Sequence, residues 1–328
     1  MGKVRDYIRS EPNREAALWP DDTSMFTQIN RYRQLSDDAG IHFALPKNEE
    51  PIARSPEHTH SLRAGLDSEE HIKERRKILS EVAGPNVLEL GSGTGSLLRL
   101  IGAELNGLDS LVGVEFSPHF FGHAADHLAD IPEGVAAPKT VFLVRADITQ
   151  MDISPRRFNT VILASILHEI KSYYSTKEVR KLLDNIYRGL KNGGKTIIYD
   201  GFRRPAGMAK MYLETPGAQK IFTAYITANK RAFDFTRDGN AIILPTTDAI
   251  EFATKANFVG WEGELEEEYY PFSLAEYETM LRETGFKIEK TQTFPEEGRY
   301  LPGVRIENVE TGEDEAPSHN NVMVIATK

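Results

Sequence analysis

The sequence predicts an α/β protein whose core is a doubly wound, mostly parallel seven-stranded sheet with an antiparallel last strand. After Pro85, short apolar runs alternate with segments of helical periodicity, which is the pattern of successive βαβ units. The runs at 161–164 and 196–199 are almost continuously apolar, as parallel strands covered on both faces require. A glycine-rich stretch follows the first apolar run and opens the first helical segment, which is typical of ligand-binding α/β sheets.

The apolar runs predict seven strands, and the segments between them predict helices. The predicted strands are 86–90, 111–115, 140–144, 160–164, 195–199, 287–294 and 321–327. The predicted helices are 96–105, 118–130, 177–190 and 273–284, the last ended by Gly285. A further helix begins near Asp67 and Ser68, which can cap it. A polar loop joins the last two strands and leaves no room for a helical crossover, so we expect them to pair antiparallel.

Three regions are expected along the chain. Residues 1–66 are polar and broken by prolines, with one plausible helix at 24–35, and are interpreted as an accessory arm or lid. Residues 67–328 form the main domain. Within it, residues 205–265 interrupt the βαβ pattern with a partly helical insertion expected to cap a substrate pocket; its aromatic residues include Tyr212, Phe222, Tyr225, Phe233 and Phe235.

Composition narrows the classes of partner. The 49 acidic and 39 basic side chains give a net charge of −10, which provides no general attraction to nucleic acid. The chain has no cysteine, so disulfides, thiolate metal sites and a cysteine nucleophile are excluded. No apolar segment is long enough for a signal peptide or a membrane span. We expect a soluble cytoplasmic protein without a membrane partner.

The segment Val87 to Gly95, VLELGSGTG, carries the strongest chemical signal. Its glycines let the backbone turn sharply and approach a ligand, and the helix that follows offers unpaired amide hydrogens. Glu115 ends the next strand, where a carboxylate can accept hydrogen bonds from both ribose hydroxyls. Glu89 precedes the first glycine by two residues; a carboxylate there opposes a diphosphate but suits a cationic amino-acid tail.

This acidic residue followed by x-G-x-G-x-G resembles the first motif of the class I S-adenosylmethionine-dependent methyltransferases. The resemblance covers roughly residues 68–328, with a family-like turn at 190–194 before the fifth strand. It implies S-adenosylmethionine as cofactor and S-adenosylhomocysteine as product. The glycines would line the methionine and sugar, Glu89 would hold the ammonium group, and Glu115 would bind the ribose. Asp147 would accept the adenine amino group and Ile148 would donate a backbone amide.

Residues after the fourth strand would lie beside the sulfonium. The complete expected cofactor set is Glu89, Gly91, Ser92, Gly93, Gly95, Glu115, Phe116, Asp147, Ile148, Ala164 and Ser165. Other interpretations remain for some of these residues: the glycine loop as a tight turn in another α/β domain, Glu115 as a solvated strand end, and Asp147 as a simple turn former.

His168 and Glu169 are the candidate catalytic residues, because they follow the fourth strand where the methyl group would be delivered. A histidine with an ordinary pKa near 6.5 is largely neutral at physiological pH and can accept a proton from a hydroxyl or amine. His168 can equally be a structural histidine at the start of a helix. Glu169 can orient it or face solvent.

Three weaker patterns were also weighed. His119, His123 and His127 share a helical face but spread over about 12 Å of axis, so no metal site is predicted. The acidic and aromatic run 262–272 is either a lid over an amine or aromatic acceptor or an exposed acidic loop with its aromatic rings in the core. The basic pairs at 75–76, 156–157 and 203–204 are interpreted as solvated helix ends or loops.

The sequence therefore predicts a methyltransferase acting on an oxygen, nitrogen or carbon nucleophile of a small molecule. One alternative is a nucleic-acid or protein methyltransferase, although the chain reads Ala164 to Leu167, ASIL, where base-modifying relatives carry N-P-P-Y or D-P-P-Y. Another alternative is a catalytically silent cofactor-binding module. The sequence does not identify the acceptor. It also leaves the oligomeric state open, and a homodimer is one of the possible states.

Overall fold

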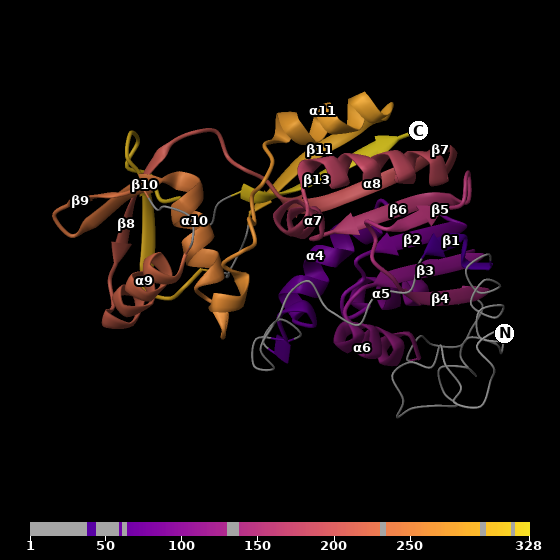
Figure 1. Cartoon of the computed structure of the whole chain (residues 1–328), viewed down its shortest axis with the longest axis horizontal. Helices are drawn as coiled ribbons and strands as arrows, with labels where there is room; N and C mark the ends of the chain where they lie inside the picture. The colour runs from indigo at the N-terminus through magenta and orange to yellow at the C-terminus, as the bar shows by residue number, and fades with distance from the viewer. Residues whose placement is uncertain are drawn as a thin grey trace.

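The computed structural model describes residues 38–43, 59–60, 64–129, 138–229, 234–295, 300–315 and 319–328. Its largest sheet has seven strands in the order β11-β13-β7-β6-β2-β3-β4 (Figure 1). The strands are β2 (Asn86–Leu90), β3 (Ser110–Glu115), β4 (Thr140–Arg145), β6 (Phe158–Ala164), β7 (Leu190–Gly201), β11 (Lys287–Pro295) and β13 (His319–Thr327). The first five are parallel, and β13 pairs antiparallel with both β7 and β11. The predicted fold class is confirmed.

Helices cover both faces of this sheet. One face carries α4 (Glu69–Leu79), α5 (Ser96–Glu104) and α6 (Pro118–Ala129), and the other carries α7 (Leu167–Tyr173), α8 (Thr176–Gly189) and α11 (Leu274–Thr284). Along β2 the buried side chains alternate between the two cores: Val87 packs on the α4 to α6 side, and Leu88 and Leu90 pack on the other. No helix in the described residues is long and apolar enough to cross a membrane.

The start of β7 and the presence of α7 differ from the sequence prediction. Strand β7 begins at Leu190 rather than Lys195, because the chain passes through Gly193, with φ of 74°, and still continues along β6. The short helix α7 was not predicted as a separate element, since its seven residues are too few to show a period. The helix expected at 24–35 lies outside the described residues.

A short strand near the N-terminus packs against the main domain. β1 (Ile41–Phe43) pairs antiparallel with β5 (Met151–Ile153), and Ile41 is fully buried in the same core as α8. The Arg157 guanidinium donates to the backbone carbonyl of Asp38 at 2.7 Å. Residues 38–43, which the sequence assigned to an accessory arm, therefore contribute to the core of the sheet domain.

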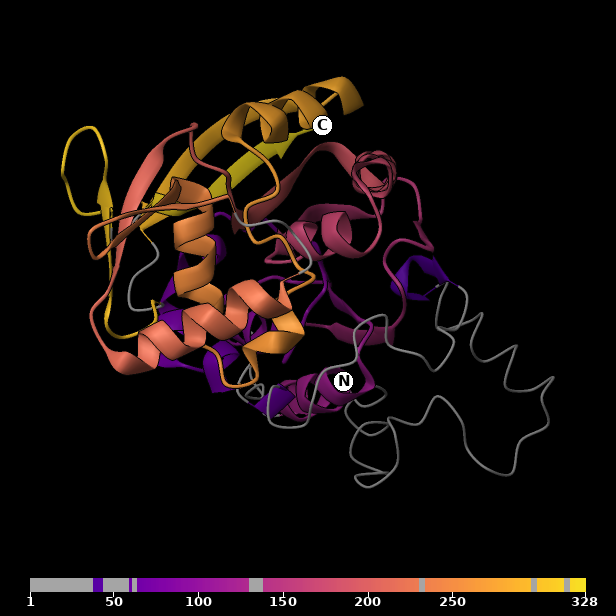
Figure 2. The ribbon, with the colours of Figure 1, turned by 60° about the vertical axis from the view of Figure 1, so that its left-hand side comes forward.

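A second, four-stranded antiparallel sheet lies beside the main one as a separate layer (Figures 1 and 2). Its order is β12-β8-β10-β9, formed by β8 (Met208–Leu213), β9 (Thr236–Asp238), β10 (Ala241–Pro245) and β12 (Val304–Asn308). Helices α9 (Pro216–Ala228) and α10 (Thr246–Lys255) and the 3-10 turn η1 (Trp261–Glu264) pack on it. We call residues 208–264 together with β12 the cap.

The cap has a core of its own, which the sequence did not reveal. Phe222 and Tyr225 are buried there against Phe252 and Trp261. Most of the aromatic residues singled out in the insertion thus stabilise the cap instead of facing a ligand. Phe233 lies outside the described residues. Strand β12 comes from between β11 and β13, so the cap is built from two separate stretches of chain.

Replacing Ile41 tests whether the N-terminal strand belongs to the core. Ile41→Ala removes fully buried methyl groups and should lower the free energy of unfolding by about 2 to 5 kcal/mol. His42→Ala, at an exposed neighbouring position, should change it by less than about 1 kcal/mol. Chemical denaturation of both variants measures the difference. Equal, small effects would mean that β1 is not part of the cooperative unit.

Candidate active site

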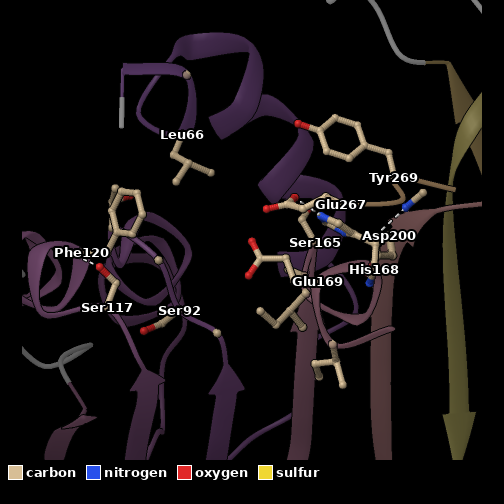
Figure 3. Close-up of a pocket in the computed structure, with 18 of the residues that line it drawn as sticks. Leu66, Ser92, Ser117, Phe120, Ser165, His168, Glu169, Asp200, Glu267 and Tyr269 are labelled. Atoms are coloured by element: carbon tan, nitrogen blue, oxygen red, sulfur yellow. Dashed lines mark hydrogen bonds and ion pairs between the residues drawn. The ribbon is translucent and has the colours of Figure 1, made fainter. Parts of the chain in front are cut away.

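One cavity of about 500 Å³ lies at the carboxyl ends of the parallel strands. Its floor comes from the loops after β2, β3, β4, β6 and β7, and its other walls come from α4 and the cap (Figure 3). Of the residues expected to contact the cofactor, all but one line it: Glu89, Gly91, Ser92, Gly93, Glu115, Phe116, Asp147, Ile148, Ala164 and Ser165. The catalytic candidates His168 and Glu169 line the same cavity.

Gly95 is the exception. It caps α5 in the left-handed region, with φ of 76°, and a Cβ there would lie 2.9 Å from the Cα of Ala124 on α6. Gly95 is therefore required for close helix packing behind the loop and does not line the cavity. Gly91 does face the cavity, and a Cβ there would lie 2.7 Å from Ile166. The backbone amides of Gly91 and Ser92 both donate to the carbonyl of Val114 at 2.9 Å, which fixes the loop against β3.

Glu115 is held by the loop that it faces. One carboxylate oxygen accepts from the amide of Gly93 at 2.7 Å, and the other accepts from the amide of Ser117 at 2.8 Å. These bonds fix the carboxylate at the end of β3, with its charge beside the glycine loop. The buried position disagrees with the alternative of a solvated strand end.

Glu89 is 2% exposed and one of its carboxylate oxygens has no hydrogen-bond partner. Burial raises the pKa of this carboxyl to about 8; the charge of Arg75 lowers it, and the charge of Glu115 raises it further. A buried, unsatisfied acceptor in a cavity is a site that a ligand donor can complete.

Arg75 is the residue here that sequence analysis misjudged. It was expected at a solvated helix end, but it is 6% exposed, lines the cavity near Glu89, and donates from Nε to His71 at 2.9 Å. Its neighbour Arg76 is exposed and pairs with Glu104. Adjacent residues of a helix point about 100° apart, so Arg75 can lie on the packed side of α4 while Arg76 faces solvent.

Asp147 makes a local turn and still lines the cavity. Its carboxylate accepts from the amide and hydroxyl of Thr149, at 2.9 and 2.7 Å, and from Gln150 and the Tyr174 hydroxyl. Asp147 thus forms a turn and also lines the cavity. Tyr174, not named from the sequence, lines the cavity at this end.

Ser165 has a strained backbone at the centre of the cavity. Its φ is 57°, in the left-handed region that residues with a Cβ rarely adopt, and its amide donates to the carbonyl of Tyr199 at 2.7 Å. Such strain often occurs at functional sites. It turns the chain from β6 into α7, so that Ser165 and His168 both face the cavity (Figure 3).

His168 is clamped between two buried carboxylates. Its Nδ1 lies 2.7 Å from an oxygen of Asp200, and its Nε2 lies 3.7 Å from an oxygen of Glu267. Burial alone lowers the pKa of the imidazole, but the charges and hydrogen bonds of Asp200 and Glu267 outweigh it and raise the pKa well above 6.5. The sequence expectation of a largely neutral imidazole is therefore wrong, because it did not include these two partners.

Glu169 does not orient His168. The orienting group is Asp200, at the end of β7, which sequence analysis did not name. The carboxylate of Glu169 instead points into the cavity (Figure 3).

The acidic and aromatic run combines features of both of its interpretations. Glu264 and Glu267 are buried and line the cavity together with Tyr269 and Tyr270, whereas Glu262 is exposed. The run is thus a wall of the site with acidic side chains turned inward. The helix-face histidines form no such group: among the described residues, the only set of donor atoms close enough to share a metal ion is that of His168, Glu169 and Glu267.

Comparison with known proteins agrees with this architecture. Residues 88–196 match a family described as "Methyltransferase domain". A highly reducing polyketide synthase, NEC1 of Pyricularia oryzae (strain 70-15), is 30% identical over 140 residues; the match covers 42% of this chain and 4% of the synthase. The chain thus spans a small part of this relative.

Two solved structures are similar to this chain. A chain of the complex containing the Haloferax volcanii Trm112 methyltransferase activator is 13% identical, with a TM-score of 0.50 over 84% of this chain and 98% of that one. An S-adenosylmethionine-dependent methyltransferase from Mesorhizobium loti is 15% identical, with a TM-score of 0.48 over 80% of this chain and 100% of that one. The matched family and the glycine motif at the end of β2 together identify the chain as one that contains a class I S-adenosylmethionine-dependent methyltransferase domain.

Proposed function

We propose that this protein transfers the methyl group of S-adenosylmethionine to a nucleophile on a small molecule, and that His168 and Glu169 act at the acceptor. The observation that carries the proposal is the continuity of the cavity. It runs from the glycine loop and Glu115 at one end to the His168–Asp200 pair at the other, so cofactor and acceptor can share one continuous space.

The cofactor half is assigned to the residues that follow β2, β3 and β4. Glu89 and Arg75 lie together and can bind the ammonium and carboxylate groups of the methionine moiety. Glu115 can accept hydrogen bonds from the ribose hydroxyls. Asp147 and Ile148 border the adenine position, and Phe116 lies beside the ribose end.

The acceptor half is assigned to α7 and the cap. When bound, the cofactor supplies an electrophilic methyl group on a sulfonium. In its deprotonated form, His168 would take the proton that the acceptor hydroxyl, amine or carbon acid loses as its bond to the methyl forms and the methyl–sulfur bond breaks, leaving S-adenosylhomocysteine; the carboxylate of Asp200 would stabilise the imidazolium. Glu169 binds the acceptor from the cavity wall. Alignment of the two reactants supplies much of the acceleration.

Three observations support a small-molecule acceptor. The volume of the cavity is within the range of small-molecule sites. A relative over part of the chain is a polyketide synthase. The net charge of −10 disfavours nucleic acid. We further propose that the cap, through Thr254, Asn257 and Phe258, shapes the acceptor space, and that residues 64–66 close the cofactor end.

Cofactor binding is tested with S-adenosylhomocysteine. Glu115→Gln weakens the ribose contacts and should reduce affinity by about 10- to 100-fold, the equivalent of 1.5 to 3 kcal/mol for charge-assisted hydrogen bonds. Gly93→Arg fills the cavity beside Leu66 and should abolish binding. Calorimetric titration measures both, with Glu104→Gln on the solvent side of α5 as a control. Wild-type affinity in both site variants would place the ligand elsewhere.

Binding should also release a proton from Glu89. The free carboxyl has a pKa of about 8 and is mostly protonated at pH 7, whereas an ammonium group beside it favours the carboxylate. Titrations at pH 7 in buffers of different ionisation enthalpy should show release that approaches one proton. Glu89→Gln should bind more weakly and release none; release that persists in this variant would assign the proton to another group.

His168 is tested as a base with the best acceptor found in a panel of small hydroxyl, amine and carbon-acid compounds. His168→Ala should keep S-adenosylmethionine affinity within about twofold and lower turnover by about 10² to 10⁴. Since the imidazole pKa is raised, the wild-type rate should increase with pH through a midpoint above 6.5, and the variant should lack this limb. If the variant instead melts early but keeps full activity per folded molecule, His168 is structural.

A further inference from the structure

Lys255 is a fully buried lysine at the last position of α10, in the cap. Its ammonium group pairs with Glu251, one helical turn earlier, at 2.6 Å. An ion pair at this spacing can form on the surface of a helix, whereas burial of an ammonium group costs free energy. The ion pair alone therefore does not explain why this lysine is buried.

Burial brings the ammonium group to residues 267–269. It donates to the backbone carbonyl of Glu267 and lies 5.1 Å from the centre of the Tyr269 ring, whose face attracts a cation. Residues 267–269 form neither helix nor strand, so their backbone groups depend on partners elsewhere in the chain. Lys255 thus joins the end of α10 to this segment.

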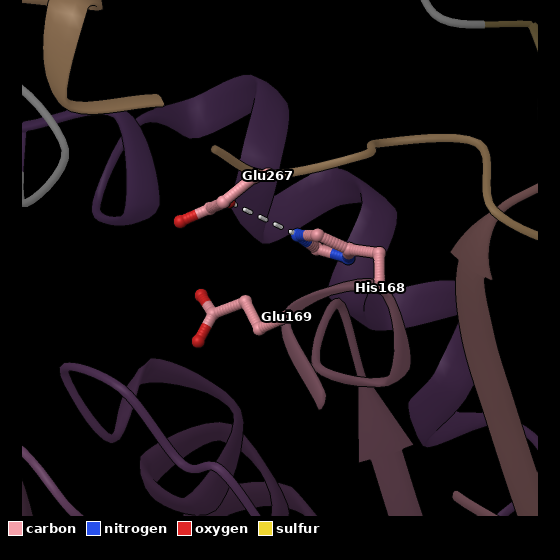
Figure 4. A group of neighbouring side chains, drawn as sticks. All are labelled: His168, Glu169 and Glu267. Carbon is pink, nitrogen blue, oxygen red and sulfur yellow. Dashed lines mark ion pairs between the residues drawn. The ribbon is translucent and has the colours of Figure 1, made fainter. Parts of the chain in front are cut away.

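The same three residues also contact α7. The amide of Glu268 donates to the Ser172 hydroxyl at 2.7 Å, and that hydroxyl donates to the carbonyl of His168 at 2.7 Å. The Tyr269 ring packs in a T-shaped arrangement on the imidazole of His168, with ring centres 5.5 Å apart. The carboxylate of Glu267 faces Nε2 of His168 at 3.7 Å (Figure 4). A displacement of residues 267–269 would therefore move Glu267 and Tyr269 relative to the imidazole.

We propose that Lys255 is a positioning residue: from the cap, it holds Glu267 against the imidazole of His168. The importance of this contact for catalysis rests on the proposed function, in which His168 is the base. Thr254, the neighbour of Lys255 on α10, lines the cavity. The helix that we propose to shape the acceptor space thus also sets the geometry of the base.

The titratable groups around the imidazole allow two modes of action to be distinguished. They are Asp200 on β7, Glu169 on α7, and Glu267 and Tyr269 in the segment 267–269. Burial lowers the pKa of the imidazole, whereas the charges and hydrogen bonds of Asp200 and Glu267 raise it. If Lys255 holds Glu267 in place, removal of the ammonium group lowers this pKa. If Lys255 acted only through its own positive charge, its removal would raise the pKa.

NMR of the histidine side chains tests the proposal without an acceptor. The full chain, with isotope-labelled histidine, is saturated with S-adenosylhomocysteine in the presence of a chelator, and the His168 signal is assigned by its absence in His168→Ala. Lys255→Met should lower the titration midpoint of His168 by about one pH unit, at the lower end of the shift that a nearby opposite charge produces. Lys220→Met, at an exposed position of α9, should leave the midpoint unchanged.

Two further variants locate the effect. Glu267→Gln should itself lower the midpoint, and Lys255→Met should add little in that background, because both substitutions act through one contact. The double variant Glu251→Gln/Lys255→Met removes both charges of the buried pair together and provides the same measurement if the single lysine variant does not fold.

The proposal is overturned if the midpoint is unchanged or higher in folded Lys255→Met, or if the shift is as large in the Glu267→Gln background as in the unaltered chain. The pH–rate profile separates this inference from the proposed function. With an acceptor from the panel, the rising limb in Lys255→Met should move to lower pH by the same amount as the midpoint. If the midpoint falls and the limb does not move, Lys255 positions Glu267 but His168 is not the base.

Discussion

The carboxylate of Asp200 fixes the geometry on which the acceptor half of the cavity depends. It is 1% exposed and accepts from the backbone amides of Leu167, His168 and Gly201 as well as lying against the imidazole. These contacts bind the end of β7 to the first turn of α7. A charged acceptor at a helix N-terminus is also favoured by the helix dipole. Because β7 lies next to β6 in the sheet, Asp200 at the end of β7 reaches α7 and fixes the direction in which the His168 imidazole points.

Parallel packing explains why most of the site could be predicted from the sequence. The strand 86–90 was predicted to the residue, because a buried parallel strand is an uninterrupted apolar run and the glycines that follow mark its end. Since the carboxyl ends of such strands share one edge, the residues after them converge, and Glu115, Asp147 and Ser165 do so. The local sequence was therefore sufficient to predict this part of the cavity, which the residues after the parallel strands form.

The part of the cavity around His168 depends on contacts between segments that are distant in the sequence. Asp200 is 32 residues from His168, and Glu267 lies in the segment between the cap and α11, so neither partner of the imidazole can be recognised from the sequence around it. The short strands β1, β5 and β9 have three residues each, too few to show alternation. β12 pairs with β8 across a long stretch of chain, and only the folded structure shows this pairing.

The path of β12 has a consequence for how the domain can be altered. Because the chain leaves the main sheet after β11, adds β12 to the edge of β8, and returns as β13, the cap consists of two separate stretches of chain, each joined to the sheet domain at both ends. Excising residues 208–264 as a single cassette would leave β12 as an isolated strand without its neighbour. The cap therefore cannot be exchanged as a single loop, and grafting it onto another scaffold requires both of its stretches of chain together.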